Sequence, residues 1–243
     1  MDWEGVTGAP DKTAARIEGM FDAIAGRYDF LNRVLSAGID RSWRKRAIRA
    51  LRLTGTERLL DVCAGTADLA IEARTAAPSA ARVVGVDFSA AMLRVGYGKL
   101  TRARLETTIA LVRGDAMQIP VASRSVDAVT IAFGIRNVEH TEGACREMHR
   151  VLRPGGRLAI LELAIPTAPL VRAAYLSYSR FVLPRIGRII SRHNAAYDYL
   201  PASVAAFETP DELVKILRKS GFMDVSAVPL TLGVVYLYTG RRD

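Results

Sequence analysis

The sequence has little of what a secreted or membrane-spanning protein needs. Cys63 and Cys145 are its two cysteines, too few for a framework of disulfides, which favours a reducing cytoplasm. The most apolar run, 158–166, has only the length of a strand and is interrupted by Glu162, so no transmembrane helix is expected. The opening residues MDWEGVTGAPDK contain neither a basic start nor an apolar stretch, so no secretory signal is predicted. We therefore expect a cytoplasmic protein.

Patterns that bind a metal or a phosphate chain are also lacking. The histidines His140, His149 and His193 are not spaced as ligands of one ion, so no metal site is expected. The chain contains neither a GxxxxGK[ST] loop nor a GxGxxG loop. These absences argue against a P-loop and against a cradle for a dinucleotide pyrophosphate.

Acidic residues are too few to balance the basic ones, which leaves a net charge of +9 and a sequence pI near 9.9. Such an excess is typical of proteins that bind nucleic acid, an anionic membrane surface or an acidic substrate. The basic residues form short clusters and no long tract, so arginines scattered over a solvated surface explain the charge equally well.

The 243 residues do contain a regular alternation of strands and helices. Strands are predicted at 58–62, 82–87, 108–113, 126–133 and 157–163. Helices are predicted at 67–76, 90–102 and 142–152, with Pro-Gly-Gly at 154–156 as a stop before the fifth strand. This alternation predicts a doubly wound, mostly parallel, Rossmann-like α/β sheet with helices on both faces. A last helix at 210–220 and two strands at 224–229 and 234–240 are expected to complete a seven-stranded sheet with an antiparallel edge pair.

Three aspartates fall at the carboxyl ends of three successive predicted strands. Asp61 closes the first strand, Asp87 closes the second, and Asp115 follows the third. In a doubly wound sheet the ligand lies beyond these ends, and an acid about twenty residues after a loop glycine binds ribose hydroxyls. Gly65 lets the backbone approach a ligand, and Thr66 offers a hydroxyl and the amide that opens a helix. Without a phosphate-binding loop, the set indicates a nucleoside with a phosphate-free tail such as S-adenosylmethionine.

Four segments around these residues resemble the successive motifs of class I S-adenosylmethionine-dependent methyltransferases. They are LLDVCAGTADLA (59–70), VVGVDFSAAML (83–93), VRGDAMQIP (112–120) and RVLRPGGRLAILEL (150–163). The resemblance implies S-adenosylmethionine as the cofactor and adds Phe88 and Ala116 to its predicted binding residues.

A narrower resemblance extends from about 20 to 240. FDAIAGRYDFLNRVLSAGIDRSWRK (21–45), IAFGIRNVEH (131–140) and the late segments VLPRIG, YDYLPASV and LTLGVVYLYTG are similar to enzymes that C-methylate the ring in ubiquinone and menaquinone biosynthesis. Asp40 stands where many members have histidine, and Cys63 and Ala67 replace loop glycines. The loop is more similar to the menaquinone branch, which implies methylation of demethylmenaquinol, with the ubiquinone branch as the alternative.

Such chemistry requires a ring carbon made nucleophilic by a deprotonated or strongly hydrogen-bonded neighbouring hydroxyl. Arg136 and Asn137 follow the fourth strand, where substrate-facing residues are usual. Arg136 can stabilise a developing quinolate, Asn137 can orient a hydroxyl or a water, and Tyr28 can cover the site from the N-terminal helices. A water held by Arg136 and Asn137 is the expected proton acceptor, with His140 as a weaker alternative.

The segment 167–207 interrupts the alternation with apolar and aromatic residues at helical spacing. Its arginines are Arg172, Arg180, Arg185, Arg188 and Arg192. Apolar and basic helices suit a peripheral contact with the anionic inner face of the cytoplasmic membrane and a channel for a polyprenyl tail. A core-packing helix or a homodimer interface explains the pattern equally well.

The chain is accordingly divided into a helical cap with two or three helices broken near 36–38 (1–55), a cofactor-binding core (56–166), the helical insertion (167–207) and a C-terminal helix with its strand pair (208–243). Base-modifying methyltransferases carry an N/D-P-P-Y/F block after the fourth strand, where this chain has AFGIRN, so no nucleic-acid partner is expected. An O- or N-methyltransferase of another small phenolic substrate, and a non-catalytic cofactor-binding module, remain alternatives.

Overall fold

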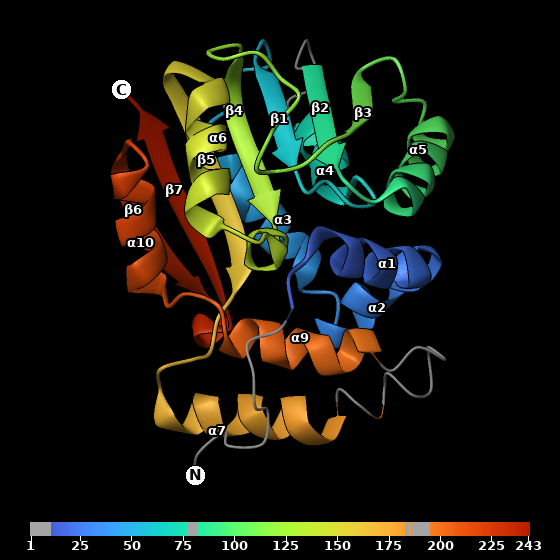
Figure 1. The fold of residues 1–243 in the computed structure, drawn as a ribbon, viewed down its shortest axis with the longest axis vertical. Helices are drawn as coiled ribbons and strands as arrows, with labels where there is room; N and C mark the ends of the chain where they lie inside the picture. The colour runs from blue at the N-terminus through green and yellow to red at the C-terminus, as the bar shows by residue number, and fades with distance from the viewer. Residues whose placement is uncertain (1–10, 77–81, 183–184, 186–194) are drawn as a thin grey trace.

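A single seven-stranded sheet forms the centre of the protein (Figure 1). The computed structural model describes residues 11–76, 82–182, 185 and 195–243. The strands are β1 (Arg58–Val62), β2 (Arg82–Asp87), β3 (Ile109–Arg113), β4 (Val126–Ala132), β5 (Leu152–Leu163), β6 (Phe222–Leu230) and β7 (Val235–Arg242). Their order is β3-β2-β1-β4-β5-β7-β6, with β7 antiparallel to both neighbours and the other pairings parallel. The predicted doubly wound, mostly parallel sheet with a C-terminal antiparallel pair is confirmed.

The chain reverses its direction of travel across the sheet between β1 and β4. From β1 it proceeds outward to β2 and β3, and from β4 it proceeds the other way to β5. In open α/β sheets this switch point is where ligands bind, just beyond the carboxyl ends of the strands.

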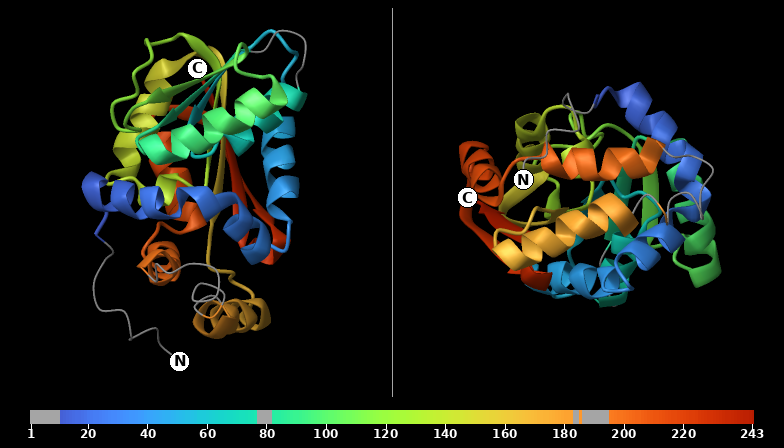
Figure 2. Two further views of the ribbon diagram at one scale, coloured as in Figure 1. Left: turned by 90° about the vertical axis from the view of Figure 1, so that its right-hand side faces the viewer. Right: turned by 90° about the horizontal axis from the view of Figure 1, so that it is seen from below.

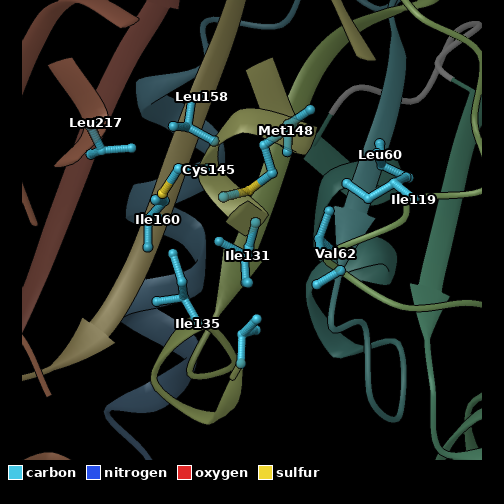
Figure 3. Packing of buried hydrophobic residues seen from close by; sticks show 14 of the residues in the cluster. Leu60, Val62, Ile119, Ile131, Ile135, Cys145, Met148, Leu158, Ile160 and Leu217 are labelled. Carbon is cyan, nitrogen blue, oxygen red and sulfur yellow. The ribbon is translucent and has the colours of Figure 1, made fainter. Parts of the chain in front are cut away.

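Helices cover both faces of the sheet because neighbouring strand residues point to opposite sides. On β1, Leu59 belongs to one buried cluster and Leu60 and Val62 belong to the other. The cluster of Leu59 is completed by α3 (Asp40–Ala50), α4 (Asp68–Ala76) and α5 (Ala90–Ala103). The cluster of Leu60 is completed by α6 (Thr141–Val151) and α10 (Pro210–Lys219), and Figure 3 shows Cys145 and Met148 of α6 packed against the strands.

The fifth strand differs from its prediction. The helix before it ends at Val151, but β5 begins at Leu152, so Pro-Gly-Gly lies inside the strand and the predicted stop at 154–156 is wrong. The pairing jumps from Val126–Leu152 to Ala128–Arg157, which marks a bulge. Gly155 has a φ of +76°, and a side chain on Gly156 would come within 2.8 Å of the Arg153 carbonyl oxygen. The glycines therefore bend a strand that continues past them.

Four helices lie beyond the carboxyl ends of the parallel strands (Figures 1 and 2). They are α1 (Ala14–Ile24), α2 (Tyr28–Leu35), α7 (Pro169–Ser177) and α9 (Ala195–Ala205). A 3₁₀ turn, Ala25–Arg27, joins α1 to α2, and a π-helical turn, Tyr178–Val182, follows α7. The predicted break near 36–38 is confirmed, with positive φ at Ala37 and Gly38. Arg188, Arg192 and His193 lie outside the described residues.

Candidate functional site

Three adjoining cavities lie between the strand ends and the helices beyond them. The strand-end cavity, about 100 Å³, is lined by Asp87, Phe88, Asp115 and Ala116 among others. The small polar cavity, about 30 Å³, contains Asp61, Thr66 and Arg44. The helix-lined cavity, about 420 Å³, is enclosed largely by α1, α2, α3, α7 and α9 and by Phe133 and Arg136. The predicted cofactor residues thus gather in the first two cavities, and Arg136 faces the third.

Asp87 organises the strand-end cavity. Its Oδ2 accepts a hydrogen bond from the Gly65 amide at 2.8 Å, and its Oδ1 accepts one from the Ser89 amide at 2.9 Å. Burial raises the pKa of Asp87, and these two amides oppose the shift by stabilising the carboxylate. Each oxygen retains a second lone pair, so the oriented carboxylate can accept two further hydrogen bonds from a vicinal diol.

The loop after β1 explains why glycine is common in loops of this kind. Cys63, Gly65 and Ala67 have φ of +52°, +54° and +67°, a region that glycine enters freely and other residues enter at a cost. A side chain on Gly134 would place its Cβ 2.4 Å from the Cβ of Cys63. Cys63 in the loop and Gly134 after β4 are therefore a matched pair of small residues.

Asp61 is a buried acid, and only one of its two carboxylate oxygens has a hydrogen-bond partner among the described residues. Oδ1 accepts a hydrogen bond from the Thr130 hydroxyl at 2.7 Å, whereas Oδ2 finds no partner among the described residues. Burial raises the pKa of Asp61 to about 7, and the neighbouring charge of Asp87 adds to the shift. A buried acceptor without a partner is costly, so this oxygen suits a positively charged donor such as an ammonium group.

The Thr66 side chain links the loop after β1 to α2 and α5. Its hydroxyl donates to Asp29 of α2 at 2.5 Å and accepts from Lys99 of α5 at 3.2 Å. Lys99 also contacts Asp29 at 2.7 Å and pairs with Asp68 of α4. A partly buried charge network therefore ties α2 to the loop, and the Thr66 hydroxyl is already occupied.

Arg136 is held by Glu162. The guanidinium Nη1 donates to Glu162 Oε1 at 2.7 Å and to the Phe133 carbonyl oxygen at 2.6 Å, and the Arg136 amide donates to Glu162 Oε2 at 3.2 Å. Burial acts to lower the pKa of Arg136, but the Glu162 carboxylate outweighs it and the pKa is raised. Arg136 is therefore a permanent, oriented cation at the wall of the helix-lined cavity.

Asn137 faces a different cavity from Arg136. It lines the strand-end cavity, where Nδ2 donates to the Phe133 carbonyl oxygen at 3.3 Å and Oδ1 finds no partner among the described residues. Placement in separate cavities does not support one water held by both side chains. His140 is exposed and lines none of the three cavities.

Tyr28 and Phe133 line all three cavities. The Tyr28 ring packs edge-on against Phe21 with centroids 6.0 Å apart, and burial raises the pKa of its phenol. The Phe133 ring meets Trp43 in the same way at 6.0 Å. A group passed between the strand-end and helix-lined cavities would cross between these aromatic side chains.

Sequence reasoning missed three charged residues of this region. Glu162 is fully buried, Asp40 is 4 % exposed and Arg44 is 7 % exposed. One signal was present, since a glutamate inside an otherwise apolar strand must have a buried partner. Arg44 carried no such signal because it belongs to a strongly basic helix, and Asp40 was singled out only because it stands where many of the similar enzymes have histidine. The described residues contain no group of His, Cys, Asp or Glu side chains that could hold a metal ion.

Comparison with known proteins agrees with this geometry. The model of the ubiE/COQ5 methyltransferase family matches residues 10–242. The chain is 50 % identical over 224 residues to the ubiquinone/menaquinone biosynthesis C-methyltransferase UbiE of Syntrophotalea carbinolica, covering 92 % of this chain and 93 % of that protein. It is 40 % identical over 227 residues to the demethylmenaquinone methyltransferase of Porphyromonas gingivalis, covering 93 % of each. A SAM-dependent methyltransferase from Aquifex aeolicus shares the fold, with a TM-score of 0.61 at 14 % identity over 82 % of this chain and 89 % of that one.

Proposed function

This chain belongs to the ubiE/COQ5 methyltransferase family, and from that premise we propose that it methylates a ring carbon of a polyprenylated demethylnaphthoquinol. It is a S-adenosylmethionine-dependent C-methyltransferase of quinone biosynthesis. The observation that carries the proposal is the large helix-lined cavity next to the strand-end cavity, with the cation Arg136 in its wall. The benzoquinol of the ubiquinone branch is the alternative substrate.

The residues of the strand-end cavity fit S-adenosylmethionine. We assign Asp87 to the ribose hydroxyls and Phe88, Asp115 and Ala116 to the adenine, because these residues line the cavity together. The Oδ2 atom of Asp61, which has no partner among the described residues, suits the ammonium group of the methionine tail. Gly65 leaves room where that tail passes the loop. When bound, the cofactor supplies a methyl group made electrophilic by a sulfonium.

Arg136 is assigned to the quinol oxygen next to the carbon that is methylated. A phenolic ring gains nucleophilic character at that carbon as its hydroxyl acquires negative charge, and a fixed cation stabilises the charge as it develops. Glu162 keeps Arg136 charged and aimed, so Arg136 acts as an electrostatic donor and does not accept a proton. Asn137 and Tyr28 are assigned to the boundary between cofactor and substrate, on the cavities that they line.

The helical additions to the core form the substrate half of the enzyme in this proposal. Most residues of the helix-lined cavity come from 20–44 and 163–201, and most are apolar or aromatic. This composition suits a fused aromatic ring and the first units of a prenyl tail. We therefore propose a division into a cap (1–55), core (56–166), insertion (167–207) and C-terminal unit (208–243).

The outer face of the insertion is proposed to contact the membrane. Leu170 is 87 % exposed and Phe181 is 51 % exposed, and Arg172, Arg180 and Arg185 lie exposed in the same segment. Exposed apolar side chains beside arginines suit the anionic inner face of a cytoplasmic membrane, from which a prenylated quinol would enter. A homodimer interface is less favoured because two copies of a basic face repel. No described helix is long and apolar enough to span a bilayer.

The deciding experiment is anaerobic methyl transfer to a short-chain demethylnaphthoquinol, with the product analysed by mass spectrometry and NMR. We expect a new methyl group on the ring carbon. The oxidised quinone, which has no hydroxyl to ionise, should not react. A methyl group found on oxygen, or equal turnover of quinone and quinol, would contradict the proposal. A clear preference for the benzoquinol would instead assign the enzyme to the ubiquinone branch.

A further inference from the structure

The helix-lined cavity contains a buried carboxylate, that of Asp40. Asp40 opens α3, is 4 % exposed, and lines this cavity together with Ser36 and Arg44. Its Oδ1 accepts a hydrogen bond from the Ser36 hydroxyl at 3.0 Å, and its Oδ2 accepts one from Arg44 Nη1. Each oxygen of an ionised carboxylate can accept two hydrogen bonds, so Asp40 has acceptor capacity left for a ligand.

Asp40 is the one proton acceptor in the described lining of the cavity. The other ionisable groups there are the phenols Tyr28, Tyr175, Tyr178 and Tyr199 and the cations Arg44 and Arg136. Burial raises the pKa of each of the four phenols, which keeps them protonated at neutral pH. A guanidinium does not lose its proton in a protein. Among the described residues, no histidine and no second carboxylate lines this cavity.

The surroundings of Asp40 also allow its charge to change. Arg44 contacts Asp40 on one side and Asp68 of α4 at 3.5 Å on the other. If Asp40 takes up a proton, the buried guanidinium still has a carboxylate partner. This arrangement avoids the large penalty of leaving a buried charge without compensation.

We propose that Asp40 is the general base that removes the hydroxyl proton of the quinol, an inference that rests on the proposed function. The hydroxyl O–H bond breaks, its proton moves to the Asp40 carboxylate, and its electron pair stays on oxygen beside Arg136. The ring carbon then bonds to the methyl carbon while the methyl–sulfur bond breaks with its electrons on sulfur. The ring carbon loses its hydrogen as a proton to solvent, and the oxygen regains a proton from Asp40, so one proton is released in total.

The first test compares kcat of Asp40→Asn with wild type. Asparagine keeps one acceptor oxygen for Arg44 and can turn its amide nitrogen to the Ser36 hydroxyl oxygen, but it cannot take a proton. The value of kcat should therefore fall about 10²- to 10⁴-fold, the range of general-base catalysis. Asp40→Glu should restore part of the rate. Asp40→His should also restore part of the rate, and its pH–rate profile should gain a new limb at about 6.5, the usual pKa of an imidazole. Asp224→Asn, an exposed residue on β6, is the matched control and should keep the wild-type rate.

A second test measures binding without turnover. A carboxylate accepts a hydrogen bond from a hydroxyl and repels a carbonyl oxygen, whereas an amide can donate to that oxygen. Wild type should therefore bind the naphthoquinol more tightly than the naphthoquinone, and Asp40→Asn should lose this preference at unchanged affinity for S-adenosylhomocysteine. Full turnover by Asp40→Asn, or an unchanged quinol preference, overturns the role of Asp40. Failure of the proposed function is seen separately, as no turnover of any quinol by wild type.

Discussion

The proposed site has a cofactor half and a substrate half, and these are formed by different secondary-structure elements and different polar groups. The cofactor half is made by the ends of β1, β2 and β3, and its polar groups are carboxylates oriented by backbone amides and a strand hydroxyl. The substrate half is made largely by helices beyond the sheet, and its cations are two buried arginines, each paired with a buried carboxylate. The strand-end cavity of the cofactor half is about 100 Å³, and the helix-lined cavity of the substrate half is about 420 Å³.

Under the proposed function, this difference follows from the ligand that each half binds. The cofactor half receives one charged ligand, and parallel strand ends place acids at regular intervals along one edge. The substrate half must receive an apolar ring and tail and still stabilise a negative charge, so its cations lie within apolar walls. Variants of the substrate half should therefore affect catalysis or membrane contact, and variants of the cofactor half should affect cofactor affinity.

Apart from that of Asp40→Asn, the largest effect is expected in the substrate half, from Arg136→Ala. Removing one oriented electrostatic donor should lower kcat by about 10²- to 10³-fold, with the affinity for S-adenosylhomocysteine nearly intact. The variant also leaves the buried Glu162 carboxylate without its cationic partner, which should lower the free energy of unfolding by about 3–5 kcal/mol. The double variant with Glu162→Gln should recover stability and remain inactive. Loss of cofactor affinity in the double variant would show that the two halves are not separable.

Next in size is the effect of Asp87→Ala on the cofactor half. The lost hydrogen bonds to a charged group should weaken cofactor binding by about 1.5–3 kcal/mol, or roughly 10- to 100-fold. Isothermal titration calorimetry with S-adenosylhomocysteine measures the change directly, and Asp224→Asn serves as the remote control because asparagine tolerates the positive φ of that position. If affinity is unchanged, the ribose assignment of Asp87 is wrong.

The pH dependence of cofactor binding tests Asp61. Its pKa is about 7 in the folded chain against 3.8 for an unperturbed group, so the unliganded protein loses stability as pH rises from about 4 to about 7. Pairing with an ammonium requires the ionised form, so binding should be about tenfold weaker at pH 6 than at pH 8. Asp61→Asn should remove the pH dependence. A flat profile in wild type would exclude Asp61 as the ammonium partner.

The smallest effect is expected at the outer face of the insertion. One arginine near an anionic surface contributes about 1 kcal/mol, so Arg172→Ala should weaken binding to anionic vesicles about fivefold at low salt. Arg58→Ala, at the opposite end of the sheet, is the matched control. The wild-type protein and both variants should bind anionic vesicles more weakly as added salt shortens the reach of surface charges. Equal sedimentation with neutral and anionic vesicles would count against the membrane contact.

The sequence alone determined the sheet and the cofactor half. Strand and helix periodicities, and the position of Asp61, Asp87 and Asp115 at strand ends, depend on residues close together in the chain. Parallel strands bring such positions to one edge whatever the remaining chain does. The stop predicted at 154–156 failed because a glycine pair serves a bulge as well as a turn, and only pairing with β4 decides between them.

The tertiary structure alone decided the substrate half. Glu162 meets Arg136 across 26 positions in sequence. Asp40 and Tyr199 line one cavity although they belong to helices far apart in the chain. The neighbouring residues Arg136 and Asn137 face different cavities because the 3₁₀ turn Ile135–Asn137 rotates them apart. Local patterns cannot encode these relations, since which buried charges find partners depends on how separate elements pack.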